Sequence, residues 1–164
     1  KGVAAARNIA ADIVEQDILI FSDDDDIWFP KKIELQLDAM KKTGCKMSST
    51  DGLIGVGIYN SEKSYQKFNA ESNYLVIKNK YQKAGSKLMD NGFPNIWDYN
   101  FLKIHNCIIC SSVLIEKEIL IKVNYMKHLK NGEDYNCWLR CLKLTNNVYL
   151  KDICFYYDAQ NYVK

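Results

Sequence analysis

Short apolar runs alternate along this chain with segments whose apolar residues recur at helical spacing. The alanine-rich stretch Gly2–Gln16 predicts a helix, and Asp17–Ser22 predicts a short buried strand bounded by charge. Pro30 marks the first turn of a second helix, which Gly44 ends. Its predicted buried face carries three apolar residues at helical spacing: Ile33, Leu37 and Met40.

The rest of the chain predicts further elements in alternation. Strands are expected at Cys45–Thr50, Ile54–Tyr59, Phe101–Ile115, Val148–Leu150 and Ile153–Tyr157, the first two on either side of Asp51-Gly52. Helices are expected at Glu116–Val123 and Glu133–Leu144, the latter with Trp138, Leu139 and Leu142 inward. Ser61–Pro94 is polar and tyrosine-rich, which suggests irregular strands or a long functional loop. Alternating helices and strands indicate an α/β fold.

Length and charge narrow the class of protein. A chain of 164 residues forms one domain or a large piece of one. The net charge is only +2 and the lysines are spread out, so no nucleic-acid surface is indicated. The apolar run Ile18–Phe21 is too short to span a membrane, and no signal peptide is recognisable, so a cytoplasmic location is expected. The chain opens at Lys1 without an initiator methionine, which suggests a fragment of a longer protein.

Six cysteines leave disulfides, zinc and core thiols as alternatives: Cys45, Cys107, Cys110, Cys137, Cys141 and Cys154. Cys107 and Cys110 stand three residues apart in a strand-like run, where their side chains would face opposite ways. No zinc-finger spacing appears and no nearby histidine completes a site. Reduced thiols packed in the core are therefore the favoured interpretation.

Four consecutive aspartates, Asp23–Asp26, follow the first predicted strand. Adjacent carboxylates repel one another, and each disfavours ionisation of its neighbours. A bound divalent cation would relieve that repulsion, and carboxylate oxygens suit magnesium, calcium or manganese. A solvated acidic loop between a strand and a helix explains the run equally well.

A second acidic pair, Glu133 and Asp134, opens the last predicted helix after Gly132. Free backbone N–H groups and the positive end of the helix dipole favour an ionised carboxylate there, so a low pKa is expected. Helix capping alone would explain this pair. The position also suits a general base that is ready to take a proton.

Three segments in this order resemble the motifs of the family 2 glycosyltransferases, which have the GT-A fold. Gly2–Asn8 resembles the family's Gly-x-x-x-Ala-Arg-Asn helix. Phe21–Lys32 resembles its Phe-Leu-Asp-x-Asp-Asp-x-Trp-x-Pro-x-Lys signature, and Glu133–Arg140 its Glu-Asp-x-x-x-Trp-x-Arg block. Each motif alone is weak, but their order along the chain is specific.

The resemblance implies a metal-dependent, inverting transfer of a sugar from a nucleoside-diphosphate sugar to an acceptor hydroxyl. It implies that Asp25, together with Asp23, holds Mn²⁺ or Mg²⁺, and that Asp23 contacts the nucleotide ribose. It also places Arg7 near the nucleotide and makes Asp134 the base that deprotonates the acceptor. A metal held by carboxylates would offset charge on the leaving nucleoside diphosphate, and the transition state would resemble an oxocarbenium ion.

The same resemblance implies one GT-A-like catalytic domain over residues 1–164. Its donor- and metal-binding half would be residues 1–60, and its acceptor and base half residues 95–164. The implied partners are a nucleotide sugar and a glycan, lipid-linked or protein acceptor of polysaccharide biosynthesis, and peripheral membrane association of the parent protein fits them. Ser61–Asn100 carries no recognisable motif and would decide the sugar, acceptor and linkage.

Several neighbouring residues have plainer interpretations. Asp24 is expected to be solvated, and Asp26 to cap the Pro30 helix or brace the loop. For Trp28, packing against the protein is favoured over stacking on a sugar. For Arg140, a structural role is expected, as an ion pair or by packing on its helix.

Residues of the long apolar run are candidates for the acceptor side. For His105, a buried and hydrogen-bonded side chain is favoured over contact with the acceptor. Ser111 and Ser112 are candidate lining residues of the acceptor pocket.

The resemblance has one departure. The family's opening strand, helix and strand, which hold the nucleotide base, have no counterpart in residues 1–164, so an N-terminally truncated domain with an unprotected sheet edge is expected. A non-catalytic sugar-nucleotide-binding fragment is therefore the main alternative. A haloacid-dehalogenase-like phosphatase would need threonine or valine where Asp26 and Ile27 stand, and a sugar nucleotidyltransferase would need a glycine-rich nucleotide loop.

Overall fold

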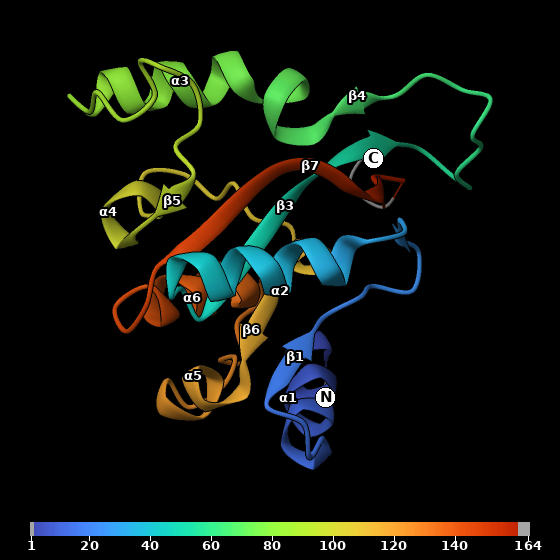
Figure 1. The fold of residues 1–164 in the computed structure, drawn as a ribbon, viewed down its shortest axis with the longest axis vertical. Coiled ribbons are helices and arrows are strands. Elements are labelled where there is room, and N and C mark those ends of the chain that lie inside the picture. Colours follow the sequence, from blue (N-terminus) through green and yellow to red (C-terminus); the bar gives the residue numbers. More distant parts are fainter. Residues whose placement is uncertain (1, 161–164) are drawn as a thin grey trace.

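A mixed sheet runs through the centre of the computed structural model, which describes residues 2–160 (Figure 1). The strands are β1 (Ile18–Ile20), β2 (Ile27–Trp28), β3 (Met47–Gly55), β4 (Gln66–Lys67), β5 (Ile96–Trp97), β6 (Leu114–Glu116) and β7 (Asn147–Asp158). The helices are α1 (Val3–Ile13), α2 (Lys32–Thr43), α3 (Tyr74–Lys83), α4 (Tyr99–Leu102), α5 (Lys117–Lys122) and α6 (Glu133–Cys141). A π-helical turn, η1 (Phe68–Ser72), and a 3-10 turn, η2 (Cys110–Ser112), complete the described elements.

The strand order is β1-β6-β3-β7-β2, with β4 beside β3 and β5 beside β7. The long strands β3 and β7 pair in parallel, and every other pairing in the described chain is antiparallel. It follows that β1, β3 and β7 run in the same direction, and that β1 ends level with Ser48, near the start of β3. Because β6 runs the opposite way, η2, which precedes it, lies next to the end of β1.

Helices cover the sheet on both faces, with α2 in front of β3 and β7 and α6 behind them in Figure 1. The larger buried cluster joins Met47 and Tyr149 of the long strands to Trp138 of α6. A smaller cluster joins Val148 and Leu114 to Met40 of α2. Neighbouring residues Val148 and Tyr149 thus face opposite sides, as strand geometry requires. The α/β class that the sequence predicts is confirmed, in the form of a mixed sheet with flanking helices.

The predicted buried face of α2 is confirmed at Met40, which is 6% exposed, and is wrong at the other two positions. Ile33 and Leu37 are 44% and 40% exposed, whereas Lys32 and Gln36 are 1% and 0% exposed. The Gln36 Nε2 donates to the Ser112 carbonyl over 2.9 Å, and the Lys32 ammonium lies 2.6 Å from Gln36 Oε1. The buried carbonyl before β6 needs donors, and polar side chains of α2 supply them.

The two strands expected on either side of Asp51-Gly52 are also wrong, because β3 continues through both residues and ends at Gly55. A Cβ at Gly52 would lie 2.5 Å from Cε1 of Phe155, so glycine serves close approach to β7 instead of a turn. The two strands predicted at the C-terminal end are likewise one continuous strand, β7. The pairing of β3 with β7 shifts register beside Asp51, which accommodates this irregularity without ending either strand.

The long strand predicted at Phe101–Ile115 is wrong for most of its length. Its start belongs to α4, which begins where the Asp98 carboxylate accepts the Phe101 N–H at 2.7 Å, and only its end enters β6. The polar region Ser61–Pro94 contains the helix α3, which the sequence pattern did not predict. The other predicted helices are confirmed with slightly different ends.

All six cysteine side chains are buried, as predicted for core thiols. Burial raises the pKa of Cys107 to about 12, which keeps that thiol protonated at neutral pH. Within residues 2–160, no helix is both long and apolar enough to cross a membrane.

Candidate active site

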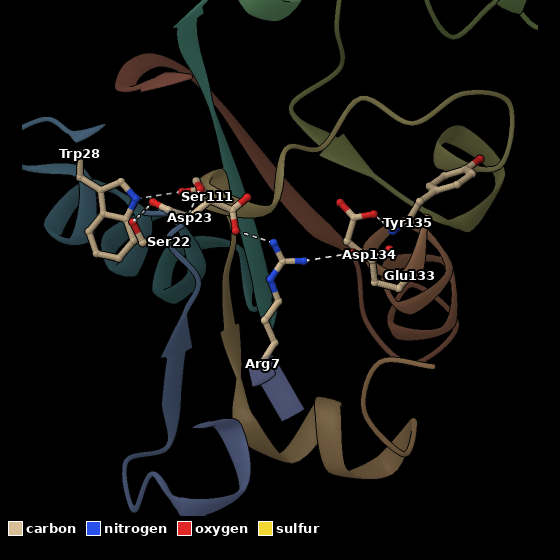
Figure 2. Close-up of polar contacts among 8 residues, drawn as sticks. All are labelled: Arg7, Ser22, Asp23, Trp28, Ser111, Glu133, Asp134 and Tyr135. Atoms are coloured by element: carbon tan, nitrogen blue, oxygen red, sulfur yellow. Dashed lines mark hydrogen bonds and ion pairs between the residues drawn. The ribbon is translucent and has the colours of Figure 1, made fainter. Parts of the chain in front are cut away.

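The aspartate run forms a turn after the end of β1, and Figure 2 shows its first residue, Asp23. The Asp26 N–H donates to the Asp23 carbonyl over 3.2 Å and closes this turn. The Asp23 N–H donates to the Ser111 hydroxyl oxygen over 2.9 Å, and Trp28 Nε1 donates to the Ser111 carbonyl over 3.1 Å. Ser111 of η2 therefore holds both ends of the turn at the sheet edge.

The four aspartates have different surroundings. Asp24 and Asp25 are exposed, and the solvation predicted for Asp24 is confirmed. Asp26 is half-buried and accepts the Asp158 N–H at 3.0 Å, so it braces the turn against the end of β7. Burial raises the pKa of Asp26 to about 6, although that hydrogen bond and its proximity to Ser111 lower it.

Arg7 of α1 connects this turn to the start of α6. Its Nη2 binds a carboxylate oxygen of Asp23, and its Nη1 lies 3.4 Å from Oε1 of Glu133 (Figure 2). The Arg7 side chain is only 15% exposed, so the guanidinium is largely shielded from water. A single cation thus joins two acidic sites that are far apart in the sequence.

The acidic start of α6 follows Gly132, which has a positive φ of 71°. The Oδ1 of Asp134 accepts the Tyr135 N–H at 2.6 Å. Burial nevertheless raises the pKa of Asp134, because it outweighs this hydrogen bond and the attraction of Arg7, and Glu133 adds repulsion. The expectation of a low pKa is therefore wrong for Asp134, since the sequence could not reveal how far the fold would bury it.

A pocket of about 690 Å³ lies between these elements. Arg7, Asp23, Glu133 and Asp134 all line it, so the two acidic sites face one cavity. Asp25 is outside the lining, although it is two residues from Asp23. Of the predicted site residues, Arg7, Asp23 and Asp134 therefore come together at one pocket, and Asp25 is not part of its lining.

The candidate residues for the acceptor side do not line this pocket. Ser111 and Ser112 are almost fully buried and do not line the pocket, so a direct role in its lining is wrong for both. Their place in η2, behind the aspartate turn, explains this. His105 is half-buried instead of buried, and its Nδ1 lies 3.1 Å from the ammonium of Lys80. Burial and that ammonium lower the pKa of His105.

Two further residues act structurally. The Trp28 ring lies 4.9 Å from the Lys32 ammonium and has the hydrogen bond to Ser111, which confirms packing against the protein. Arg140 donates to the carbonyls of Val123 and Tyr125, and its Nε donates to Asn136. The structural interpretation of Arg140 is confirmed, with backbone carbonyls as its main partners in place of an ion pair.

Other pocket residues escaped the sequence analysis. They come from η1, the segment before η2, the loop before α6 and the end of β7, and they include Phe68, Asn106, His128, Lys130 and Tyr157. None stands in a motif. The only available signal was the position of His128 and Lys130 shortly before the acidic pair of α6.

A mixed sheet, an aspartate turn after β1 and an acidic helix start thus meet at one pocket, as the resemblance to the GT-A glycosyltransferases implied. The chain belongs to glycosyl transferase family 2, whose sequence model matches residues 1–108. This match includes Arg7 and the aspartate turn and ends before α6.

Curated relatives agree with this family. The chain is 29% identical over 147 residues to the Escherichia coli UDP-Glc:alpha-D-GlcNAc-diphosphoundecaprenol beta-1,3-glucosyltransferase WfgD, covering 89% of this chain and 46% of WfgD. It is 28% identical over 140 residues to an uncharacterized glycosyltransferase of Rickettsia bellii, covering 85% of this chain and 17% of that protein. The chain therefore spans less than half of the length of either relative.

Solved structures share the fold. The S. aureus TarS 1-349 crystal structure superposes with a TM-score of 0.58 at 15% identity, covering 95% of this chain and 40% of TarS 1-349. The same protein in complex with UDP-GlcNAc gives a TM-score of 0.55 at 16% identity, covering 96% and 39%. These similarities confirm the GT-A-like fold that the sequence motifs implied.

Proposed function

We propose that this chain carries the donor- and acceptor-binding pocket of a metal-dependent, inverting glycosyltransferase. The observation that supports this most is the single pocket lined by Arg7, Asp23 and Asp134. It combines a cation for a diphosphate, a carboxylate near the exposed Asp25, and a half-buried carboxylate on a different element. Because the chain belongs to glycosyl transferase family 2, we interpret this combination of residues as a site for sugar transfer.

The donor side is assigned to the aspartate turn. Among residues 2–160, no cluster of three or more histidine, cysteine, aspartate or glutamate side chains is arranged as a metal site. Two carboxylates still fit Mn²⁺ or Mg²⁺, because such ions are commonly held by one or two carboxylates together with substrate phosphates. Asp25 and Asp23 would hold the ion, which would supply Lewis-acid stabilisation of charge on the departing diphosphate.

Arg7 contributes charge of its own. Its guanidinium already binds Asp23 and lies near Glu133, so it keeps a fixed position in the pocket without substrate. A preorganised cation favours charge that develops on the leaving group, because no reorganisation is needed at that moment. Arg7 would therefore orient the donor diphosphate while fixing Asp23.

Asp134 is assigned as the general base. Burial raises its pKa, which brings the carboxylate closer to the proton affinity that an effective base needs near neutral pH. It would take the proton of the acceptor hydroxyl as the oxygen attacks the anomeric carbon. Donor and base residues come from different elements, which suits attack from the face opposite the leaving group.

The activity that gives WfgD its name and the complex of TarS with UDP-GlcNAc make UDP-glucose and UDP-GlcNAc the first donors to test. Binding of UDP, with and without Mn²⁺, is measured by titration calorimetry, and release of UDP from each donor is measured separately.

Asp134→Asn should retain UDP binding and lose turnover. Binding without turnover in the unmodified protein would instead favour a non-catalytic sugar-nucleotide-binding role. Absence of UDP binding by the folded protein would contradict the assignment of the donor site for this nucleotide, and GDP and dTDP are the next probes.

A further inference from the structure

Asp51 is a buried carboxylate in the middle of β3, only 1% exposed, which the proposed reaction does not use. Its Oδ1 accepts the N–H groups of Gly52 and Asn69, each at 2.9 Å. Its Oδ2 accepts the Ala70 N–H at 3.0 Å. Charge-assisted bonds to backbone donors are strong, and burying a carboxylate without them would be costly. Asp51 therefore fastens the π-helical turn η1 to the sheet.

A second buried side chain fastens η1 on its other side. Asn69 is 1% exposed, and its Nδ2 donates to the Cys107 carbonyl over 3.0 Å. The segment after Cys107 enters the pocket lining at Ile108 and Ile109. Single π-helical turns are rare and are found frequently at functional sites. Two polar anchors thus hold an unusual turn against the wall of the pocket.

The residue that this anchoring places in the pocket is Phe68, the first residue of η1. Its ring lies edge-on to that of Tyr157, with 6.1 Å between centroids and an interplanar angle of 75°. Phe68 and Tyr157 are the aromatic residues of the lining, which also includes Ile108 and Ile109, and its charged residues include Arg7, Asp23 and Asp134. The pocket therefore offers an aromatic surface and carboxylates to the same ligand.

That combination fits a pyranose ring. A pyranose has a flat face of C–H bonds, which packs on an aromatic ring, and a rim of hydroxyl groups, which bonds to carboxylates. Ligand pockets commonly join an apolar, aromatic lining to a few polar groups that fix orientation. The diphosphate is already assigned to the aspartate turn, so the aromatic part is left for the acceptor, whose hydroxyl must reach Asp134.

We infer that Phe68 packs against the sugar ring of a saccharide acceptor, and that Asp51 is the positioning residue that holds Phe68 in the pocket. This inference rests on the proposed function for the identity of the reaction, while the saccharide contact can be measured without turnover. It selects a saccharide from the acceptor classes that the family resemblance leaves open. It also explains why a region without any motif contributes to the site.

The test is saturation-transfer NMR with methyl glycopyranosides of glucose, N-acetylglucosamine and galactose as ligands. The unmodified protein should saturate the ring C–H protons of at least one of them. Phe68→Leu keeps an apolar side chain without the aromatic face and should weaken that binding about tenfold or more. Phe29→Leu is the matched control, because Phe29 pairs with Tyr59 at 5.2 Å and is outside the pocket lining.

Absence of saturation with the unmodified protein, or equal binding by Phe68→Leu, would overturn the inference. Calorimetric UDP binding is measured on the same samples and decides the proposed donor site separately. Asp51→Asn replaces one acceptor oxygen by an amide that cannot accept the Ala70 N–H, so saccharide binding should weaken although Phe68 is unchanged. A folded Asp51→Asn variant with full saccharide binding would remove the positioning role of Asp51.

Discussion

Arg7 Nη1 lies 3.4 Å from Glu133 Oε1, although 126 positions separate these residues in the sequence. The same guanidinium binds Asp23 through its other terminal nitrogen. Arg7 consequently connects α1, the aspartate turn and α6 at one wall of the pocket. One guanidinium therefore pairs with both acidic sites.

Replacing Arg7 by methionine keeps much of its apolar stem and removes its charge. Asp23 and Glu133 would then lose their shared cation, and we expect the free energy of unfolding to fall by about 1–2 kcal/mol. UDP affinity should fall as well, because the carboxylates are no longer neutralised or held. Urea unfolding and calorimetry measure the two effects. Lys67→Met, which removes an exposed pair with Glu71, should change neither. Unchanged UDP binding in Arg7→Met would contradict the role of Arg7.

The aspartate turn offers a closely matched pair of serine variants. Ser111→Ala removes the oxygen that accepts the Asp23 N–H, so Mn²⁺-dependent UDP affinity should fall about fivefold, which corresponds to about 1 kcal/mol. Ser112→Ala removes a hydroxyl that donates to the Ile109 carbonyl over 2.7 Å. It should cost comparable stability and leave UDP affinity unchanged. Equal losses of affinity in both variants would mean that η2 acts only on stability.

Variants of the adjacent exposed residues Asp24 and Asp25 can distinguish specific metal binding from attraction by general negative charge. Asp25→Asn should abolish the Mn²⁺-dependent part of UDP binding, because it removes a proposed ligand of the ion. Asp24→Asn removes the same formal charge one residue away and should retain that part. Calorimetry in the presence of Mn²⁺ or of a chelator measures both variants. If Asp24→Asn is as defective as Asp25→Asn, the turn attracts cations only through its net charge.

The buried ammonium group of Lys32 should make the stability of the folded protein depend on pH. Burial lowers its pKa from 10.5 to about 8 in the folded protein, while nearby Cys154 raises it slightly. Between these values the unfolded chain binds the proton more tightly, so the free energy of unfolding should rise with pH. One pKa unit corresponds to about 1.4 kcal/mol, and a gain of about 2 kcal/mol is expected between pH 8 and 10. Urea unfolding across this range measures it.

Lys32→Met should remove that rise, whereas Lys41→Met on the exposed side of the same helix should retain it. A rise of equal size in both variants would assign the effect to another group.

Local patterns identified much of the architecture because helix periodicity and charged boundaries act over a few residues. They predicted α1, β1, α5 and α6 and the two acidic sites. They failed where a glycine serves close packing, as at Gly52 beside Phe155, and where polar side chains satisfy a buried carbonyl, as on α2. Both failures depend on a neighbour that is remote in sequence.

The sequence by itself determined the family, through the order of three motifs, and it identified Arg7, Asp23, Asp25 and Asp134 as the residues of interest. Only the tertiary structure decided that Arg7 joins the acidic sites, that burial raises the pKa of Asp134, and that Phe68 enters the same pocket. The physical reason is that solvation and long-range contacts are set by strand order. The pairing of β1 with β6 brings the aspartate turn beside η2, and α1 and α6 place Arg7 and Glu133 next to that turn.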